Sequence, residues 1–148
     1  VKKKVISIDI SINKEALKSL RNSKYSDNIF TLEGSSTSKK IEEEVASLIT
    51  KEDRIMVVLD SMHTHNHVLN ELKIFAKYVS SGCYLCVMDT AISYLPDKFS
   101  SNRPWSRANS PMTALKEFLK IYKNFNVDTS IDNKLAISVA KKGYLIKS

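Results

Sequence analysis

Two short apolar runs in this chain each end in an aspartate. The run at residues 55–59 leads into Asp60, and the run at residues 84–88 leads into Asp89. Runs of this length are typical of buried strands, and open α/β sheets bind their ligands in the crevice beyond the carboxyl ends of the strands. The pattern therefore predicts an α/β sheet with a metal or ligand site where Asp60 and Asp89 meet.

Strand-like and helix-like segments alternate along most of the chain. Strands are expected at residues 4–9, 29–32, 55–59 and 83–88, and helices at 13–22, 38–49, 65–79 and 113–122. Two further strands are expected around 125–128 and 135–139, separated by a turn at Asp132-Asn133. The alternation predicts a doubly wound, mostly parallel sheet, and the last two strands predict an antiparallel C-terminal pair.

The composition fits one ordinary globular domain over residues 1–148. The chain is 43% hydrophobic, and no apolar stretch approaches the roughly 20 residues that cross a bilayer. Its start leads into a short strand and not into the apolar core of a signal peptide. We therefore expect a cytoplasmic protein without a transmembrane segment.

Basic residues outnumber acidic ones by 23 to 16, which gives a net charge of +7. The lysines are spread over the whole length, and no basic run interleaved with aromatic residues is present. This distribution does not favour a nucleic-acid partner.

Cys83 and Cys86 form a C-x-x-C pair, which by itself fits a zinc half-site or a redox pair. Both lie in an expected strand, where residues three apart point to opposite faces. We interpret them as buried structural thiols of a reducing compartment.

All three histidines lie between Asp60 and residue 67. His63, His65 and His67 form an H-x-H-x-H pattern like that of zinc hydrolases, although such sites recruit further histidines downstream. The alternative site uses Asp60 and Asp89 as oxygen ligands of Mg²⁺. His63, three residues after Asp60, could then act as a general base, since imidazole titrates near neutral pH; otherwise it caps or packs a helix.

Four stretches together resemble a known family. They are residues 58–72 (VLDSMHTHNHVLNEL), 88–90 (MDT), 102–105 (NRPW) and 131–135 (IDNKL). On these strings the chain resembles the cephalosporin hydroxylase/rhamnosyl O-methyltransferase family, with similarity through most of its length. The resemblance implies a Rossmann-like class I fold dependent on S-adenosylmethionine (SAM), and, as for many members, methylation of a sugar hydroxyl.

The resemblance also implies where SAM binds. Asp9 matches the acid that hydrogen-bonds the ribose, and Gly34, Ser35 and Ser36 match the turn that approaches the adenine. From the residues alone, Asp9 is equally a helix cap and Gly34 an ordinary turn. The family places a strand, a glycine-rich turn and a helix ahead of the residue matching Val1. We therefore expect the C-terminal portion of a longer chain, or a domain whose gap another chain fills.

The metal site follows from Mg²⁺-dependent relatives, the catechol and macrolide-sugar O-methyltransferases. These carry an Asp after the fourth strand, a base three residues later, and an acidic or amide pair after the fifth strand. Asp60, His63 and Asp89 match these places. Met88 stands where the first member of the pair would be, so the resemblance implies one ligand fewer or a shifted coordination.

The polar segment at residues 92–112 is longer than an ordinary connection, and such loops are usually lids or binding loops. Arg103, Trp105 and Asn109 are candidate contacts of a small-molecule or glycan acceptor, because a tryptophan face stacks on a sugar ring. Trp105 is equally interpretable as a loop anchor packed on the core. We expect a SAM-dependent O-methyltransferase for a sugar hydroxyl of a polysaccharide or secondary metabolite; a homo-oligomer remains open.

Three alternatives stand beside that expectation. A non-catalytic methyltransferase-fold domain would serve in assembly, and a zinc hydrolase would use the H-x-H-x-H cluster. An iron enzyme would take Asp60, His63 and His65 as a two-histidine-one-carboxylate triad.

Overall fold

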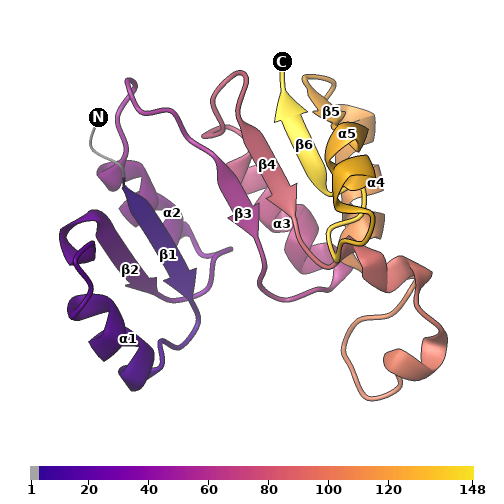
Figure 1. Ribbon diagram of the computed structural model, residues 1–148, viewed down its shortest axis with the longest axis horizontal. Coiled ribbons are helices and arrows are strands. Elements are labelled where there is room, and N and C mark those ends of the chain that lie inside the picture. The colour runs from indigo at the N-terminus through magenta and orange to yellow at the C-terminus, as the bar shows by residue number, and fades with distance from the viewer. Residues whose placement is uncertain (1–3) are drawn as a thin grey trace. The chain divides into compact units, whose positions relative to one another are not determined.

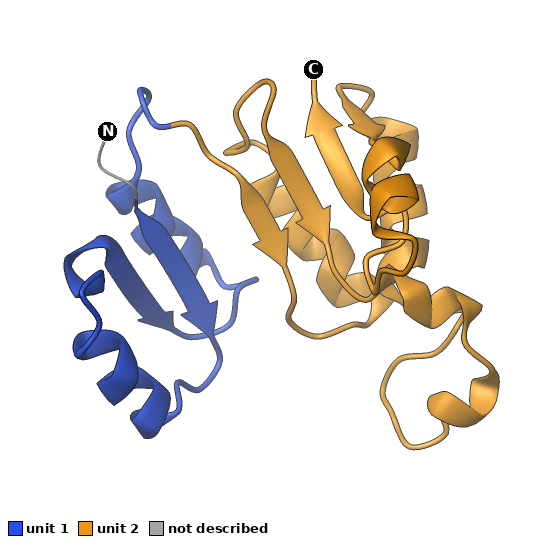
Figure 2. Ribbon diagram, viewed as in Figure 1, with its two compact units in different colours: residues 1–53 blue, residues 54–148 orange. Residues whose placement is uncertain are grey.

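The computed structural model describes residues 4–148, and the chain divides into two compact units, residues 1–53 and 54–148 (Figure 1, Figure 2). The elements of the first unit are β1 (Val5–Asp9), α1 (Lys14–Arg21), the 3-10 helix η1 (Ser26–Asn28), β2 (Ile29–Glu33) and α2 (Lys39–Leu48). Strands β1 and β2 are parallel, with Asp9 opposite Glu33 at their carboxyl ends. The first unit is therefore the expected β-α-β arrangement followed by a helix.

Side chains at the expected positions begin both helices of the first unit. The Asn13 side chain accepts hydrogen bonds from the backbone N–H groups of Glu15 and Ala16. The Ser38 side chain accepts one from Ile41. Each cap satisfies donors that a helix start leaves without intrahelical partners, so the predicted helix beginnings are confirmed.

The second unit contains a four-stranded sheet. Its elements are β3 (Val57–Leu59), α3 (His65–Phe75), β4 (Tyr84–Val87), η2 (Thr90–Tyr94), η3 (Asp97–Phe99), α4 (Pro111–Ile121), β5 (Phe125–Val127), α5 (Thr129–Leu135) and β6 (Tyr144–Lys147). The strand order is β3-β4-β6-β5. Strand β3 is parallel to β4, and β6 is antiparallel to both β4 and β5. An α/β fold with an antiparallel C-terminal strand pair is therefore confirmed.

The core of the second unit lies between its sheet and the packed helices α3 and α4. Figure 1 shows α3 lying against one face of the sheet. Fully buried side chains from these elements are Leu72, Leu85, Leu115, Phe118 and Leu145. Burying one such side chain contributes about 1.5–3 kcal/mol, so this core holds the strand ends in place.

The prediction of a strand at residues 135–139 was wrong. Asp128 caps helix α5 by accepting from the backbone N–H of Ser130, and the helix runs through the expected turn to Leu135. The alternating apolar residues stay exposed, Leu135 by 50%, Ile137 by 92% and Val139 by 54%. The strand that pairs with both β4 and β5 is β6, whose Leu145 is completely buried in the core.

Four strands keep one edge without a strand partner in the part of the chain that the structure describes. Strands β1 and β2 pair only with each other, β3 pairs only with β4, and β5 pairs only with β6. An open edge exposes backbone N–H and C=O groups that could pair with another strand.

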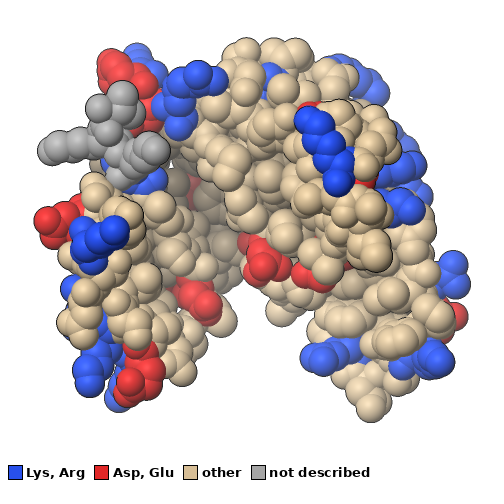
Figure 3. Space-filling model, in the orientation of Figure 1, with Lys and Arg blue, Asp and Glu red and all other residues tan. Residues whose placement is uncertain are grey.

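The remaining expectations concern surface and cysteines. Cys86 is buried and Cys83 partly exposed, both as free thiols, and burial raises the pKa of Cys86. On the face shown in Figure 3, Lys and Arg side chains are interspersed with uncharged surface. Among residues 4–148, no helix is both long and apolar enough to span a membrane. The single domain, the cytoplasmic location and the lack of a nucleic-acid partner stay predictions.

Candidate active site at the ends of β3 and β4

The pairing of β3 with β4 brings the two predicted aspartates to one rim. Leu59 lies opposite Val87 in the parallel ladder, and the backbone N–H of Met88 donates to the carbonyl of Leu59 at 2.9 Å. The ladder therefore continues to the last residue before each aspartate. Asp60 and Asp89 leave the sheet side by side, as the sequence predicted.

Asp60, His63 and Asp89 converge at this rim. One ligating atom from each lies within 4.8 Å of the others. His63 Nε2 is 3.5 Å from Asp89 Oδ2, and the two side chains are 25% and 33% exposed. The cluster is thus partly shielded from water but open to a ligand.

The backbone around Asp89 is held in an uncommon conformation. Asp89 has a φ of +55°, in the left-handed region that aspartate tolerates better than most residues. The next residue, Thr90, is fully buried and donates its hydroxyl to the carbonyl of Lys141 at 2.7 Å. The backbone N–H of Ala91 donates to Val139 at 3.0 Å. These bonds fix the turn that aims Asp89 at the rim.

The electrostatics of the rim favour a cation. Burial raises the pKa of the Asp89 carboxyl, the His63 imidazole opposes this rise, and the charge and hydrogen bond of Asp60 add to it. Two charged carboxylates this close repel each other, and a shared positive charge would stabilise them. Mg²⁺ is commonly held by one or two carboxylates together with waters, so the donor set fits this ion.

The other two histidines face different carboxylates. His65 Nε2 is 3.2 Å from Glu117 Oε2, and its Nδ1 is 2.9 Å from the Thr113 hydroxyl. His67 Nε2 is 3.4 Å from Glu71 Oε1. The H-x-H-x-H pattern therefore forms no converging zinc cluster in residues 4–148. Asp60, His63 and His65 likewise form no iron triad there.

Sequence reasoning missed Glu71. This carboxylate is only 2% exposed, and its Oε1 accepts a hydrogen bond from the Ser61 hydroxyl at 2.7 Å. The sequence does contain a signal for it. Glu71 falls three residues after Val68 and four before Phe75, inside the apolar stripe of α3, where a charge is unusual.

The long loop reaches the rim through Trp105. The Trp105 ring lies edge-on to the His63 ring with centroids 6.2 Å apart, and the Arg103 guanidinium lies 5.8 Å from the Trp105 centroid. Asn109 ties the loop down: its Oδ1 accepts from the backbone N–H of His65 at 2.8 Å, and its Nδ2 donates to Pro104 at 3.0 Å. Trp105 thus lies next to His63 of the cluster, Arg103 lies near Trp105, and the amide of Asn109 anchors the loop.

The four residues expected to bind SAM lie in the first unit. Asp9 Oδ1 accepts from the backbone N–H of Ser11 at 3.0 Å, and the carbonyl of Asp9 accepts from Gly34 at 2.8 Å. Gly34 has a φ of +154°, and a Cβ there would lie 3.0 Å from the Ile41 side chain. Glycine is therefore required locally, and Ser35 and Ser36 follow it in the turn before α2.

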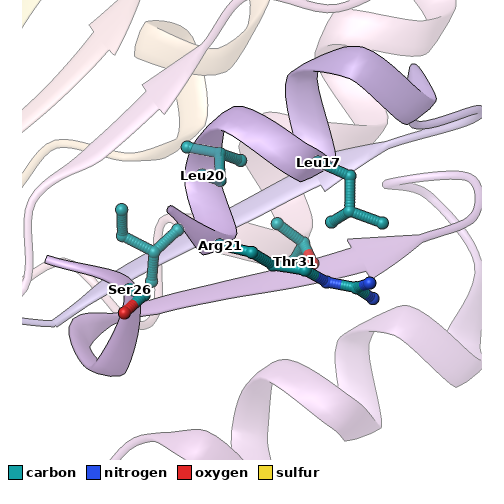
Figure 4. A pocket seen from close by; sticks show the side chains of 6 residues that line it. Leu17, Leu20, Arg21, Ser26 and Thr31 are labelled. Atoms are coloured by element: carbon teal, nitrogen blue, oxygen red, sulfur yellow. The ribbon is translucent and has the colours of Figure 1, made fainter. Parts of the chain in front are cut away.

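The first unit also contains a shallow pocket of about 150 Å³ (Figure 4). Its lining side chains come from α1, η1 and β2: Leu17, Leu20, Arg21, Ser26, Ile29 and Thr31. None of the predicted SAM-binding residues lines it. The pocket is therefore separate from the turn at the carboxyl ends of β1 and β2.

Similar solved structures share this fold. The MycE methyltransferase from the mycinamycin biosynthetic pathway, in complex with Mg and SAH, superimposes with a TM-score of 0.51 at 18% identity, covering 77% of this chain and 27% of MycE. Its complex with Mg, SAH and mycinamycin VI gives the same TM-score at 16% identity, over 77% of this chain and 28% of that one. These comparisons establish the class I methyltransferase fold.

Similar sequences agree with the resemblance seen in the motifs. Rhamnosyl O-methyltransferase of Mycobacterium tuberculosis (strain ATCC 25618 / H37Rv) is 30% identical over 123 residues, 82% of this chain and 48% of the relative. The protein of the same description from Mycobacterium leprae (strain TN) is 26% identical over 148 residues, 97% of this chain and 59% of the relative. The chain thus spans about half the length of these relatives. The family described as Rhamnosyl O-methyltransferase/CmcI matches residues 1–148, and the chain belongs to this family.

Proposed function

We propose that this protein is a SAM-dependent O-methyltransferase that acts on a sugar hydroxyl of a glycan or secondary metabolite. The observation that carries the proposal is the convergence of Asp60, His63 and Asp89 at the strand ends of a methyltransferase fold. Relatives described as rhamnosyl O-methyltransferases support the sugar acceptor.

The cofactor is assigned to the carboxyl ends of β1 and β2. Asp9 and Gly34 are joined there by a backbone hydrogen bond, which keeps an acidic side chain next to a glycine turn. In the proposal, Asp9 accepts hydrogen bonds from the ribose hydroxyls of SAM, and Gly34, Ser35 and Ser36 contact the adenine. The MycE structures that contain SAH support this choice of cofactor.

The proposed chemistry is attack of an acceptor oxygen on the SAM methyl carbon. The new C–O bond forms as the S–C bond breaks, and the hydroxyl proton passes to His63. Nε2 of His63 faces Asp89, so this carboxylate stabilises the imidazolium that forms. Mg²⁺, when held by Asp60 and Asp89, would supply Lewis acidity that lowers the pKa of the acceptor hydroxyl.

The acceptor is assigned to the side of the rim where the long loop approaches. Trp105 offers an aromatic surface 6.2 Å from the His63 ring, a distance at which one sugar ring could contact both. Arg103, stacked near Trp105, offers hydrogen-bond donors to sugar oxygens. Asn109 serves as the anchor that keeps Pro104 and the following Trp105 in place.

We also propose that residues 1–148 act together with an additional segment of polypeptide. The open edges of β1 and β3 support this, because an additional strand would satisfy backbone groups that now lack strand partners. The limited coverage of the relatives supports it as well. The additional segment would bring the glycine-rich turn expected for the methionine part of SAM.

The test combines SAM binding with methyl transfer. Calorimetric titration of the protein should detect SAM binding, and label from methyl-labelled SAM should appear on a sugar acceptor. We expect His63→Ala to lower kcat by about 10²–10⁴-fold, the range for loss of a general base, with SAM affinity nearly unchanged. His65→Ala is the control, because His65 faces Glu117 and should cause a much smaller loss. Absence of SAM binding and transfer would favour the non-catalytic alternative.

A further inference from the structure

We propose that Glu71 is a positioning residue that sets the cation affinity of the rim by holding Ser61, the residue between the proposed ligand Asp60 and the proposed base His63. The inference rests on the proposed function only in that Asp60 and Asp89 bind a divalent cation. It adds a residue of helix α3 that touches neither the cation nor the acceptor.

The burial of Glu71 is the first reason. Glu71 is the one charged side chain with nearly complete burial in residues 4–148, at 2% exposure. Helix α3 places it among the apolar residues that form the core. A carboxylate is costly to bury unless hydrogen bonds or an opposite charge compensate it, so an apolar residue would suit the core better. The stability of helix α3 therefore does not explain why position 71 carries a carboxylate.

The contacts of Glu71 lead directly to the site. Its Oε1 accepts from the Ser61 hydroxyl at 2.7 Å, and His67 Nε2 lies 3.4 Å from the same oxygen. A hydrogen bond to an ionised acceptor is shorter and stronger than one between neutral groups. His67, one helical turn before Glu71, supplies the polar partner within α3.

Ser61 lies in the segment that carries the site. Residues 60–64 join β3 to α3 without regular secondary structure. Asp60, the first residue of this segment, is exposed. The bond from Ser61 to Glu71 ties this segment to a rigid helix immediately beside Asp60 and two residues before His63. Loss of outer partners that orient metal ligands typically costs about 10–100-fold in metal affinity.

A second histidine–glutamate pair provides a matched control. His65 and Glu117 are 3.2 Å apart and connect α3 with α4, and Thr113 contacts the same imidazole. Neither Glu117 nor Thr113 contacts Ser61 in the described hydrogen bonds. Breaking this pair, in which the Glu117 side chain is 46% exposed, removes a histidine–glutamate interaction from the same helix but leaves the tie on Ser61 intact.

The experiment measures Mn²⁺ binding, as a spectroscopic substitute for Mg²⁺, by electron paramagnetic resonance. Ser61→Ala and Glu71→Gln should each raise the Mn²⁺ Kd, Ser61→Ala by about 10–100-fold. Ser61→Thr, which keeps the hydroxyl, and Glu117→Gln should stay within about twofold of wild type, the scatter expected for independent sites. The double variant of Ser61→Ala and Glu71→Gln should be no worse than the weaker-binding single variant, because both remove one tie.

The outcomes separate this inference from the proposed function. Thermal unfolding of each variant, followed by circular dichroism, identifies any variant that fails to fold. Ser61→Ala changes an exposed residue and is therefore the variant that decides the inference. If Mn²⁺ binding depends on Asp60 and Asp89 but folded Ser61→Ala binds like wild type, the positioning role is wrong and the metal site stands. If wild type binds no Mn²⁺, or if Asp60→Asn binds equally well, the metal site itself is wrong.

Discussion

Replacing Asp89 by asparagine should stabilise the metal-free protein. Asp60 and Asp89 offer ligating oxygens within 4.8 Å of each other, and each charge disfavours the other. At 4.8 Å two unit charges repel by about 0.9 kcal/mol at the dielectric constant of water, and by about 3.5 kcal/mol at an effective dielectric constant of 20.

The lower value applies here. Asp60 is exposed and the Asp89 side chain is one-third exposed, so water screens the pair. We therefore expect Asp89→Asn to raise the free energy of unfolding by about 1 kcal/mol, which corresponds to about 2–4 °C in Tm for a chain of this size. Measurement at about pH 8, where imidazole is ordinarily neutral, limits the contribution of the lost attraction to His63.

The assay is calorimetric unfolding in EDTA and then in excess Mg²⁺. Binding to the native state at 100 times Kd should stabilise wild type by about 2.7 kcal/mol, whereas the variant should gain much less. The order of the two Tm values should therefore reverse when Mg²⁺ is added. Asp97→Asn, at an exposed aspartate of η3, is the control and should shift neither value appreciably.

The reasoning is refuted if Asp89→Asn melts at or below the wild-type Tm in EDTA and gains as much as wild type from Mg²⁺. The first result would show that the two carboxylates do not repel measurably. The second would show that Asp89 is no metal ligand.

Two further predictions concern the sheet of the second unit. The Ser130 hydroxyl and the Tyr84 hydroxyl hold the pKa of Asp128 below its usual value, and Asp128 in turn raises the pKa of Tyr84. The Asp128 contribution is present above about pH 4 and is lost as pH falls through the lowered pKa, while the Tyr84 contribution is lost as pH rises above about 10. Tyr84→Phe should therefore weaken the acid limb in urea unfolding across pH, because the Ser130 hydroxyl still acts on Asp128, and remove the Tyr84 contribution to the alkaline limb; unchanged limbs would contradict this. Gly143→Ala should destabilise by about 3 kcal/mol or more in the same assay, because its Cβ would lie 2.1 Å from a backbone carbonyl oxygen of β4. Gly82→Ala, with a φ of +71° but only an ordinary contact of its Cβ with the Arg54 side chain at 3.8 Å, should cost only about 1–2 kcal/mol, and equal costs would refute the steric argument.

Local signals in the sequence predicted most of the elements. The caps Asn13 and Ser38 mark helix starts because they satisfy nearby backbone donors, an interaction that spans only three residues. The alternation of strands and helices predicted that the strands before Asp60 and Asp89 are parallel, because a helix between two strands allows the second to run in the same direction. The error at residues 135–139 arose because alternation alone does not say which apolar segment the core accepts; Leu145 was buried and Ile137 was not.

The sequence by itself determined the α/β architecture and the rim on which Asp60, His63 and Asp89 meet, because strand order and the three-residue offset from Asp60 to His63 bring them there. It could not assign partners to His65 and His67. His65 contacts Asn109 and Thr113, 44 and 48 residues away, and only the packing of α3 on α4 brings them together. The apolar stripe of α3 marks Glu71 as a buried position, but only the tertiary structure shows its contact with Ser61, ten residues away.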